Sequence, residues 1–242
     1  MTDLVVASSP KSLISEGFRT LRTNLQFSAI NGKLRTIAVV SSMQSEGKSF
    51  TSANLACAFA QAGEKVLLID CDMRRGRLHT IFNVSNDRGF SNLLIDNIQR
   101  YDDYIVRTEI KNLSLLPMGT IPPNPAELIA SEKNKRLMEI FKEEYDIIIY
   151  DCVPVTGLTD SLIMSKLVDA TVIVASEKIT PIELLQNTKK SLANVGANIA
   201  GVVLNRVETD NGVYANKYYG KYYQWLIFII ISCMASMMDL EL

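Results

Sequence analysis

Residues 36–49 read TIAVVSSMQSEGKS, a run of apolar and β-branched residues that leads into a segment with helical periodicity. The run Thr36–Val40 is typical of a buried strand, and a helix is predicted to follow over Lys48–Ala62. Between them, Gly47-Lys48-Ser49 matches the end of the phosphate-binding pattern GxxxxGK followed by Ser or Thr. In that pattern backbone N–H groups surround the phosphates, the lysine reaches their oxygens and the hydroxyl ligates Mg²⁺. We therefore predict that this junction binds the phosphates of ATP.

Short apolar runs alternate with helical segments along the rest of the chain. A parallel sheet with helices on both faces produces this pattern, so the predicted fold class is α/β with a doubly wound, mostly parallel sheet. Beyond the first, the predicted strands are Val66–Ile69, Leu113–Leu116, Ile147–Tyr150, Ala170–Ala175 and Ile199–Leu204. The further predicted helices are Ser12–Ala29, Ser91–Leu94, Ser131–Glu144, Asp160–Val168 and Pro181–Val195. Such a sheet places its ligand crevice at the carboxyl ends of the strands.

The composition argues against several classes of protein. A net charge of −1 gives no electrostatic basis for binding nucleic acid. The single histidine, His79, makes a histidine-ligated metal cluster or a Ser-His-Asp triad difficult to build. The four cysteines lack a metal-binding spacing, and we expect free thiols in a reducing cytosol at Cys57, Cys71, Cys152 and Cys233.

The 242 residues divide into three predicted parts. Residues 1–206 form a P-loop domain, a usual length for one α/β domain. Residues 207–223 are a tyrosine-rich tail with neither a helical nor a strand period, and residues 224–242 are an apolar tail. The apolar tail falls short of the roughly 20 residues needed to span a bilayer, so a soluble, cytoplasmic body is expected. An altered reading frame, an aggregation-prone segment and a membrane contact are alternatives for this tail.

Carboxylates follow two of the predicted strands. Val66–Ile69 leads into Asp70-Cys71-Asp72-Met73-Arg74, and Ile147–Tyr150 leads into Asp151. These strand ends lie beside the expected crevice, and Mg²⁺ takes oxygen ligands such as carboxylates, hydroxyls, phosphates and water. A Mg²⁺ site near the P-loop is therefore predicted, in which one carboxylate could instead accept a proton as general base. The alternative is that these carboxylates only cap their strands.

Together these motifs resemble the bacterial tyrosine kinases (BY-kinases) that control capsule and exopolysaccharide synthesis. The segment from Asp70 to Arg74 resembles their Walker A′ motif, hydrophobic-DxDxR. Residues 121–128, IPPNPAEL, and 202–206, VVLNR, are similar to two further segments of that family. A similar tyrosine cluster follows, made of Tyr214, Tyr218, Tyr219, Tyr222 and Tyr223. The resemblance covers nearly the whole chain and implies a P-loop NTPase fold of the deviant-Walker, ParA/MinD-like type.

The resemblance implies a role for each matching position in an ATP- and Mg²⁺-dependent protein-tyrosine kinase. The implied catalytic residues are Lys48, Asp70, Asp72 and Arg74, with Asp70 as the candidate base. Nucleotide binding is implied for Ser42, Gln44, Ser45, Glu46, Gly47, Lys48, Ser49, Phe50, Asn205 and Arg206. Metal binding is implied for Ser49, Asp72 and Asp151. The tail tyrosines would be the acceptors, phosphorylated in trans when a tail enters a neighbour's site.

The resemblance also implies partners. Glu16, Arg19 and Arg22 match an ExxRxxR motif that joins subunits into a homo-oligomeric ring, and their spacing places them on one broad helix face. On spacing alone these charges would equally fit a solvated face. A separate, membrane-embedded activator of the polysaccharide co-polymerase type would recruit the chain to the inner face of the cell membrane. A cognate tyrosine phosphatase would reverse the phosphorylation.

Three positions depart from the family pattern. Ser42 and Ser45 stand where glycine is usual, and Val153 replaces a proline after Asp151. A non-glycine residue at positive φ is strained, so these changes bear on nucleotide affinity and turnover.

Two other functions fit part of the sequence. One is a ParA/MinD-like ATPase switch, whose signature lysine would fall at Met43, a residue that lacks the charge. The other is a nucleotide-binding scaffold with weak or absent turnover, which would be compatible with Ser45 and Val153. The tyrosine cluster, together with Met43, favours the kinase.

Overall fold

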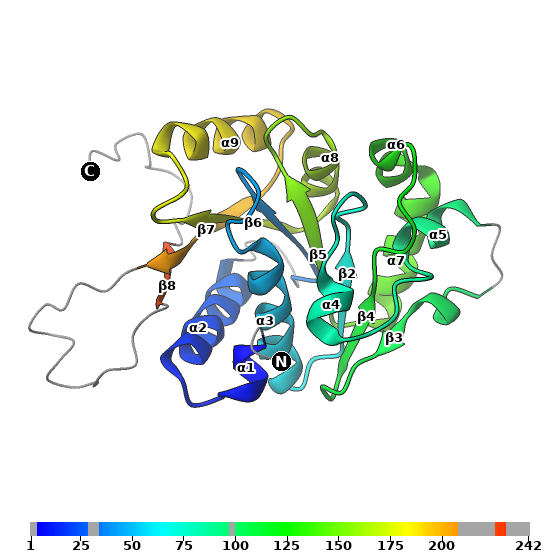
Figure 1. Cartoon of the computed structure of the whole chain (residues 1–242), viewed down its shortest axis with the longest axis horizontal. Helices are drawn as coiled ribbons and strands as arrows, with labels where there is room; N and C mark the ends of the chain where they lie inside the picture. The colour runs from blue at the N-terminus through cyan, green and yellow to red at the C-terminus, as the bar shows by residue number, and fades with distance from the viewer. Residues whose placement is uncertain (1–3, 29–33, 97–99, 208–225, 231–242) are drawn as a thin grey trace, which may run out of the picture.

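The computed structural model describes residues 4–28, 34–96, 100–207 and 226–230, the last range by its backbone alone. Its sheet has eight strands in the order β3-β4-β2-β5-β1-β6-β7-β8 (Figure 1). Neighbours from β4 to β7 pair in parallel, whereas β3 with β4 and β7 with β8 pair antiparallel. The strands are β1 (Thr36–Ser41), β2 (Val66–Asp70), β3 (Val106–Arg107), β4 (Leu113–Leu116), β5 (Ile147–Pro154), β6 (Ala170–Ser176), β7 (Ile199–Val207) and β8 (Leu226–Ile230).

Helices cover both faces of the sheet. The described helices are α1 (Val5–Ser8), α2 (Leu13–Ser28), α3 (Lys48–Gln61), α4 (Leu78–Phe82), α5 (Phe90–Ile95), α6 (Pro125–Ala130), α7 (Glu132–Glu144), α8 (Asp160–Leu167) and α9 (Ile182–Asn194). A 3₁₀ turn spans Asp102–Tyr104. Helices α1 to α4 contribute to the apolar core on one face, and α5 to α9 to the core on the other (Figure 1).

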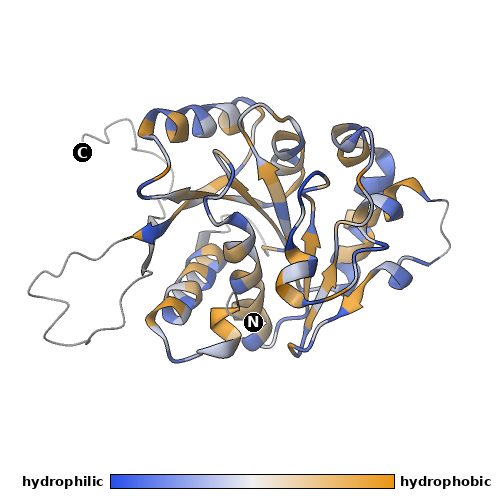
Figure 2. Ribbon diagram, viewed as in Figure 1, coloured by the Kyte–Doolittle hydropathy of each residue, from blue (hydrophilic) through white to orange (hydrophobic). Residues whose placement is uncertain are grey.

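The strands alternate between these two cores. In β1, Ile37 and Val39 belong to the core shared with α1 to α4, whereas Ala38 and Val40 belong to the opposite core. Every residue of β1, β2, β5 and β6 is buried, as expected for parallel strands covered on both faces. Figure 2 shows apolar residues along the strands and mixed hydropathy on the helices.

Strand β1 occupies the position that determines where a ligand binds. It lies between β5 and β6, and after β1 the chain crosses to β2 on one side, while β6 and β7 lie on the other. Ligands of open α/β sheets bind at such a reversal, outside the carboxyl ends of the strands. The P-loop, which joins β1 to α3, opens at this point.

The predicted fold class is confirmed, and every predicted strand and helix is present. Strands β5 and β7 run further than predicted. The sequence analysis missed the short elements α1, α4, α6 and β3, as well as β8, which lies in the apolar tail. Helix α6 begins at Pro125, within the segment 121–128, because proline suits a first helical position. Among the described residues, no helix has both the length and the apolar character needed to cross a membrane.

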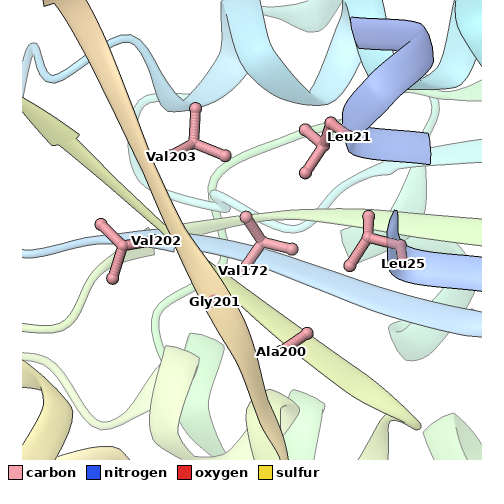
Figure 3. A pocket seen from close by; sticks show the side chains of 7 residues that line it. All are labelled: Leu21, Leu25, Val172, Ala200, Gly201, Val202 and Val203. Carbon is pink, nitrogen blue, oxygen red and sulfur yellow. The ribbon is translucent and has the colours of Figure 1, made fainter. Parts of the chain in front are cut away.

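An apolar pocket lies where α2 meets β6 and β7 (Figure 3). It is lined by Leu21, Leu25, Val172, Ala200, Gly201, Val202 and Val203. None of these side chains is polar, so the pocket offers nothing that would recognise a phosphate. It belongs to the contact between the added N-terminal helix and the sheet.

Candidate active site

The P-loop has a conformation that requires glycine at position 47. Gly47 has a φ of +94°, and a Cβ at this position would lie 1.9 Å from the side-chain nitrogen of Asn205. That nitrogen donates to the carbonyl oxygen of Glu46 at 3.0 Å, so the end of β7 contacts the P-loop. Arg206 follows with a φ of +57°. Ser45 also has a positive φ, +67°, so the strain expected at this serine is present.

Lys48 begins α3, and its side chain is buried among carboxylates. Its Nζ donates to Oδ1 of Asp151 at 2.9 Å and lies 3.8 Å from Oδ2 of Asp72. Burial by itself lowers the pKa of Lys48, but the attraction of Asp151 and Asp72 outweighs it, and the net shift of the pKa is upward. The side chain is therefore held as an ammonium group at a helix N-terminus, where the helix dipole also favours anions.

Asp151 has one carboxylate oxygen that is paired and one that is not. Oδ1 accepts hydrogen bonds from Lys48 and, at 3.1 Å, from the hydroxyl of Ser52. Oδ2 is buried with no hydrogen-bond partner among the described residues. A buried polar atom without a partner calls for an explanation, and an oxygen beside a phosphate-binding lysine suits the hydration shell of Mg²⁺. The residues present thus fit this metal.

The metal would be shared between the protein and its substrate. Among the residues that the structure describes, no group of three or more His, Cys, Asp or Glu could hold a metal ion by itself. Mg²⁺ usually keeps several waters and is bound through one or two carboxylates together with phosphates. Asp72, Asp151 and Ser49, which is half-buried in the first turn of α3, are suited to that mode.

Asp70 ends β2, and its carboxylate is enclosed by the segment that follows. Its Oδ2 accepts from the N–H of Leu78 at 3.0 Å, and its Oδ1 from the N–H of Asp72 at 3.3 Å. A Cβ on Gly76 would lie 2.6 Å from the same carboxylate. Burial, and then the charge of Asp151, raise the pKa of Asp70 well above its ordinary value. A raised pKa suits a proton acceptor, but a substrate hydroxyl would reach this carboxylate only if residues 76–78 moved aside.

Asp72 and Arg74 belong to the turn after β2. Oδ1 of Asp72 accepts from the N–H groups of Arg74 and Arg75, at 3.3 and 2.9 Å, whereas Oδ2 is the oxygen nearer to Lys48. The guanidinium of Arg74 donates twice to the carboxylate of Asp160, at 3.2 and 3.3 Å. Asp160 begins α8 and is buried; the sequence analysis did not single it out. Arg74 is therefore anchored beside the carboxylates by a two-point ion pair.

The other residues expected to bind nucleotide lie around the same loop. The side chain of Phe50 differs from them because it packs against the core. The hydroxyl of Ser42 is buried with no partner in the described part of the chain, and Oε1 of Gln44 accepts from Arg75 at 2.9 Å. The ring of Phe50 packs against Phe18, with ring centroids 5.9 Å apart. The side chain of Phe50 is thus partly buried against the core, unlike the other side chains expected at the loop.

A buried contact to the P-loop was not foreseen. Glu46 is 1% exposed and accepts hydrogen bonds from the N–H of Met43, at 2.9 Å, and from the hydroxyl of Thr180. Thr180 follows β6 and is 134 residues away in sequence. No local pattern marks such a residue, because its partner is brought near only by the sheet order.

The residues of the predicted ring motif have partners within the chain. Glu16 and Arg19 form an ion pair, Arg19 also donates to the carbonyl of Pro10 at 2.6 Å, and Arg22 donates to the carbonyl of Ala58 at 3.0 Å.

Part of the prediction falls outside the described residues. The five tail tyrosines from Tyr214 to Tyr223 lie there, as does Cys233. The remaining cysteines, Cys57, Cys71 and Cys152, are buried free thiols, as expected.

Sequence comparison places the chain among proteins with this arrangement. A family model described as an AAA domain matches residues 34–200. A CapB protein of Staphylococcus aureus is 37% identical over 221 residues, which cover 91% of this chain and 96% of that protein. The tyrosine-protein kinase YwqD of Bacillus subtilis is 36% identical over 203 residues, 84% of this chain and 85% of YwqD.

Solved structures agree in fold over most of the chain. The chimerical protein CapA2B2 matches with a TM-score of 0.82 and 40% identity, over 86% of this chain and 92% of that one. The kinase domain of the Escherichia coli tyrosine kinase ETK matches with a TM-score of 0.80 and 29% identity, over 86% and 83%. The septum site-determining protein MinD of Pyrococcus horikoshii, at 24% identity and a TM-score of 0.61 over 73% and 72%, shares the fold.

Proposed function

This chain belongs to the family of bacterial tyrosine-protein kinases, and we propose that it phosphorylates its own C-terminal tyrosines in trans with Mg-ATP. One observation carries the proposal: the ammonium of Lys48, at the start of α3, is surrounded by carboxylates from β5 and from the turn after β2. The family supports the tyrosine as acceptor. The proposed acceptors are Tyr214, Tyr218, Tyr219, Tyr222 and Tyr223.

In this proposal the P-loop residues hold the nucleotide. Lys48 exchanges its bond to Asp151 for phosphate oxygens, and the hydroxyl of Ser49, with Asp72 and Asp151, orients the ligands of the metal. When bound, Mg²⁺ would neutralise charge on the β- and γ-phosphate oxygens. Asn205, and next to it Arg206, would lie near the base.

Two further residues act on the transferred group or on its acceptor. Asp70 is the proposed proton acceptor for the tyrosine hydroxyl, because burial and the charge of Asp151 raise its pKa and make its carboxylate a stronger base. Its enclosure means that residues 76–78 would have to uncover it when the acceptor binds. Arg74 would place positive charge near the transferred phosphoryl group, in an orientation fixed by Asp160.

Assembly and location form part of the same proposal. Glu16, Arg19 and Arg22 would join subunits into a homo-oligomeric ring, in which one subunit's tail enters its neighbour's site. A membrane-embedded activator of the polysaccharide co-polymerase type would bring this cytoplasmic kinase to the inner face of the membrane, and a cognate tyrosine phosphatase would oppose it. Phosphorylation would then regulate capsular and exopolysaccharide synthesis and export. The CapA2B2 chimera supports the idea of a second, fused partner in such systems.

The test is to incubate the purified full chain with Mg-ATP and an activator fragment, and to map phosphate by mass spectrometry. We expect phosphate on residues 214–223 that disappears in Lys48→Met and persists in the control Lys166→Met, a change of an exposed lysine on α8. Mixing an inactive full chain with an active chain that lacks the tyrosines should label the inactive one, which tests transfer in trans. ADP release without phosphotyrosine would indicate a ParA/MinD-like switch instead, and binding without either product would indicate a scaffold.

A further inference from the structure

Glu46 places a carboxylate inside the P-loop. Its Oε2 accepts from the N–H of Met43 at 2.9 Å, its Oε1 accepts from the hydroxyl of Thr180, and its backbone carbonyl accepts from Asn205 at 3.0 Å. The residue is 1% exposed. A buried carboxylate is costly unless it is hydrogen-bonded, so these donors fix the position of Glu46.

Thr180 is itself held by the turn after β6. Its hydroxyl accepts from the N–H of Ser176 at 2.8 Å while it donates to Glu46, and its own N–H donates to the carbonyl of Ser176 at 2.9 Å. Strand β6, which ends at Ser176, pairs directly with β1, the strand that leads into the P-loop. Thr180 therefore ties the P-loop to the end of the neighbouring strand.

The P-loop contains a residue that needs such support. Ser45 has a φ of +67° and lies between Met43 and Glu46. A non-glycine residue in this region is strained, and it stays there only where the surroundings hold it. The hydrogen bond from Met43 to Glu46 spans Ser45, and Thr180 holds the carboxylate that accepts this bond.

We propose that Thr180 is a positioning residue for nucleotide binding. Its hydroxyl holds Glu46, and Glu46 holds the strained P-loop in the conformation in which its N–H groups converge on the phosphates. The proposal rests on the proposed function, namely that residues 42–49 bind the phosphates of ATP. If Thr180 acts in this way, its hydroxyl is necessary for full affinity for Mg-ATP, although the hydroxyl contacts the P-loop and not the phosphates.

A hydrogen bond that only stabilised the fold would behave differently. Its loss would lower the unfolding midpoint and leave the affinity of the folded protein unchanged. Thr171 offers a control, because it is a buried threonine on β6, the strand that precedes Thr180, and its hydroxyl donates to the carbonyl of Ser165 at 3.5 Å. Thr171 is the second residue of β6, near the end of the strand opposite to the P-loop, so Thr171→Val should affect stability and not affinity.

The test measures the Kd for Mg-ATP of the full chain by calorimetry, and KM and kcat from phosphotyrosine formation. We expect Thr180→Val to raise Kd and KM about tenfold with little change in kcat, since hydrogen bonds to charged groups are worth roughly that factor. Thr180→Ser keeps the hydroxyl and should bind like the unchanged chain. In a Ser45→Gly background a positive φ costs little, so Thr180→Val should weaken binding by no more than about twofold.

Three results would overturn the proposal: unchanged affinity in folded Thr180→Val, an equal loss in Thr180→Ser, or an equal loss with and without Ser45→Gly. If Thr180→Val does not fold, Thr180→Ala measured in both backgrounds gives the same comparison. Failure of the proposed function is distinguishable: if the unchanged chain binds Mg-ATP but forms no phosphotyrosine, the kinase proposal fails and the Kd comparison still tests this inference. If the unchanged chain binds no Mg-ATP, the premise of both fails. That result would remove both proposals, whereas normal binding by the unchanged chain and by Thr180→Val would remove only this one.

Discussion

The ammonium of Lys48 lies 2.9 Å from Oδ1 of Asp151, although 103 residues separate the two in sequence. The contact exists because β1, which leads into Lys48, pairs in parallel with β5, which carries Asp151. Both groups are buried, and the charge of Asp151 is the largest of the effects that raise the pKa of Lys48. The same pair that positions the phosphate-binding lysine thus also contributes to the stability of the sheet around it.

Lys48→Met should therefore affect both activity and stability. It removes the cation that would bind phosphates, and it leaves the carboxylate of Asp151 buried with only the hydroxyl of Ser52 as a donor. We expect loss of phosphotyrosine and a decrease in the free energy of unfolding of about 3 kcal/mol, the range for breaking a buried ion pair. Urea unfolding at neutral pH measures the second effect, and exposed Lys166→Met is the control. Unchanged stability would mean that Asp151 does not depend on this lysine.

The raised pKa of Asp70 predicts how the stability of the chain depends on pH. The sign of this dependence is opposite to that expected for an ion-paired carboxylate. Its pKa is raised in the folded chain by burial and by Asp151, while in the unfolded chain it is about 3.9. From about pH 4 up to the raised pKa, the native state binds more protons than the unfolded state, so this group lowers stability as pH rises. Asp70→Asn should thus stabilise the chain more at pH 8 than at pH 5 while lowering kcat.

Thermal midpoints of both proteins at the two pH values check this expectation, with exposed Asp103→Asn as the control. An equal gain at pH 5 and pH 8 would show that Asp70 is ionised over the whole range.

The sequence was sufficient for the parts of the fold that depend on long local patterns. Apolar runs that form strands, such as Thr36–Val40, alternate with segments of helical period, such as Asp160–Val168. The sequence predicts the bounds of these elements within a few residues. Elements of few residues, such as α1 and β3, carry too short a period to recognise. Strand β8 could not be predicted, because an apolar run alone does not show that it pairs with the edge of β7.

The candidate site likewise contains residues that the sequence predicts and residues that it does not. Asp70 and Asp151 directly follow predicted strands, and Lys48 follows the first strand after the P-loop, so a parallel sheet brings them to the carboxyl ends of its strands. The structure does bring them together. Asp160 and Thr180 reach the site only through tertiary contacts with Arg74 and Glu46. No spacing along the chain contains that information.

The ion pair between Arg74 and Asp160 predicts coupled effects of two variants. Arg74→Ala leaves a buried carboxylate without its two donors, and Asp160→Asn leaves the guanidinium without its anchor. Each variant should cost about 1–3 kcal/mol of stability and lower kcat, and the double variant should cost less than the sum. A double-mutant cycle on unfolding and on kcat measures the coupling. Arg75→Ala, at an exposed neighbour that bonds Gln44, should show no coupling to position 160.

Deletion of residues 225–242 tests the role of β8. This strand pairs antiparallel with β7 over Val202–Val207, so its removal leaves β7 as an unpaired edge. We expect a lower unfolding midpoint and more self-association. Any rise in the Kd for Mg-ATP should come only through Asn205 and Arg206 on β7, because the P-loop lysine and the carboxylates lie on α3, on β2 and β5 and in the turn after β2. Calorimetry and light scattering measure these quantities. If solubility and midpoint are unchanged, the segment has no role in the fold.

The proposed ring contact can be tested more cleanly at one arginine than at two. Arg22 donates to the carbonyl of Ala58 on α3, so Arg22→Ala removes a contact within the chain as well as any contact between chains. Arg19 lies on the surface, pairs with Glu16 and donates to Pro10, and surface pairs contribute little to stability.

Arg19→Ala should therefore leave the unfolding midpoint nearly unchanged while it converts a large oligomer to monomer, alone or with Arg22→Ala. Light scattering with size-exclusion chromatography measures the mass, and Gln26→Ala on the exposed side of α2 is the control. A mass unaffected by Arg19→Ala both alone and together with Arg22→Ala, or a monomeric parent chain, would rule out the ring.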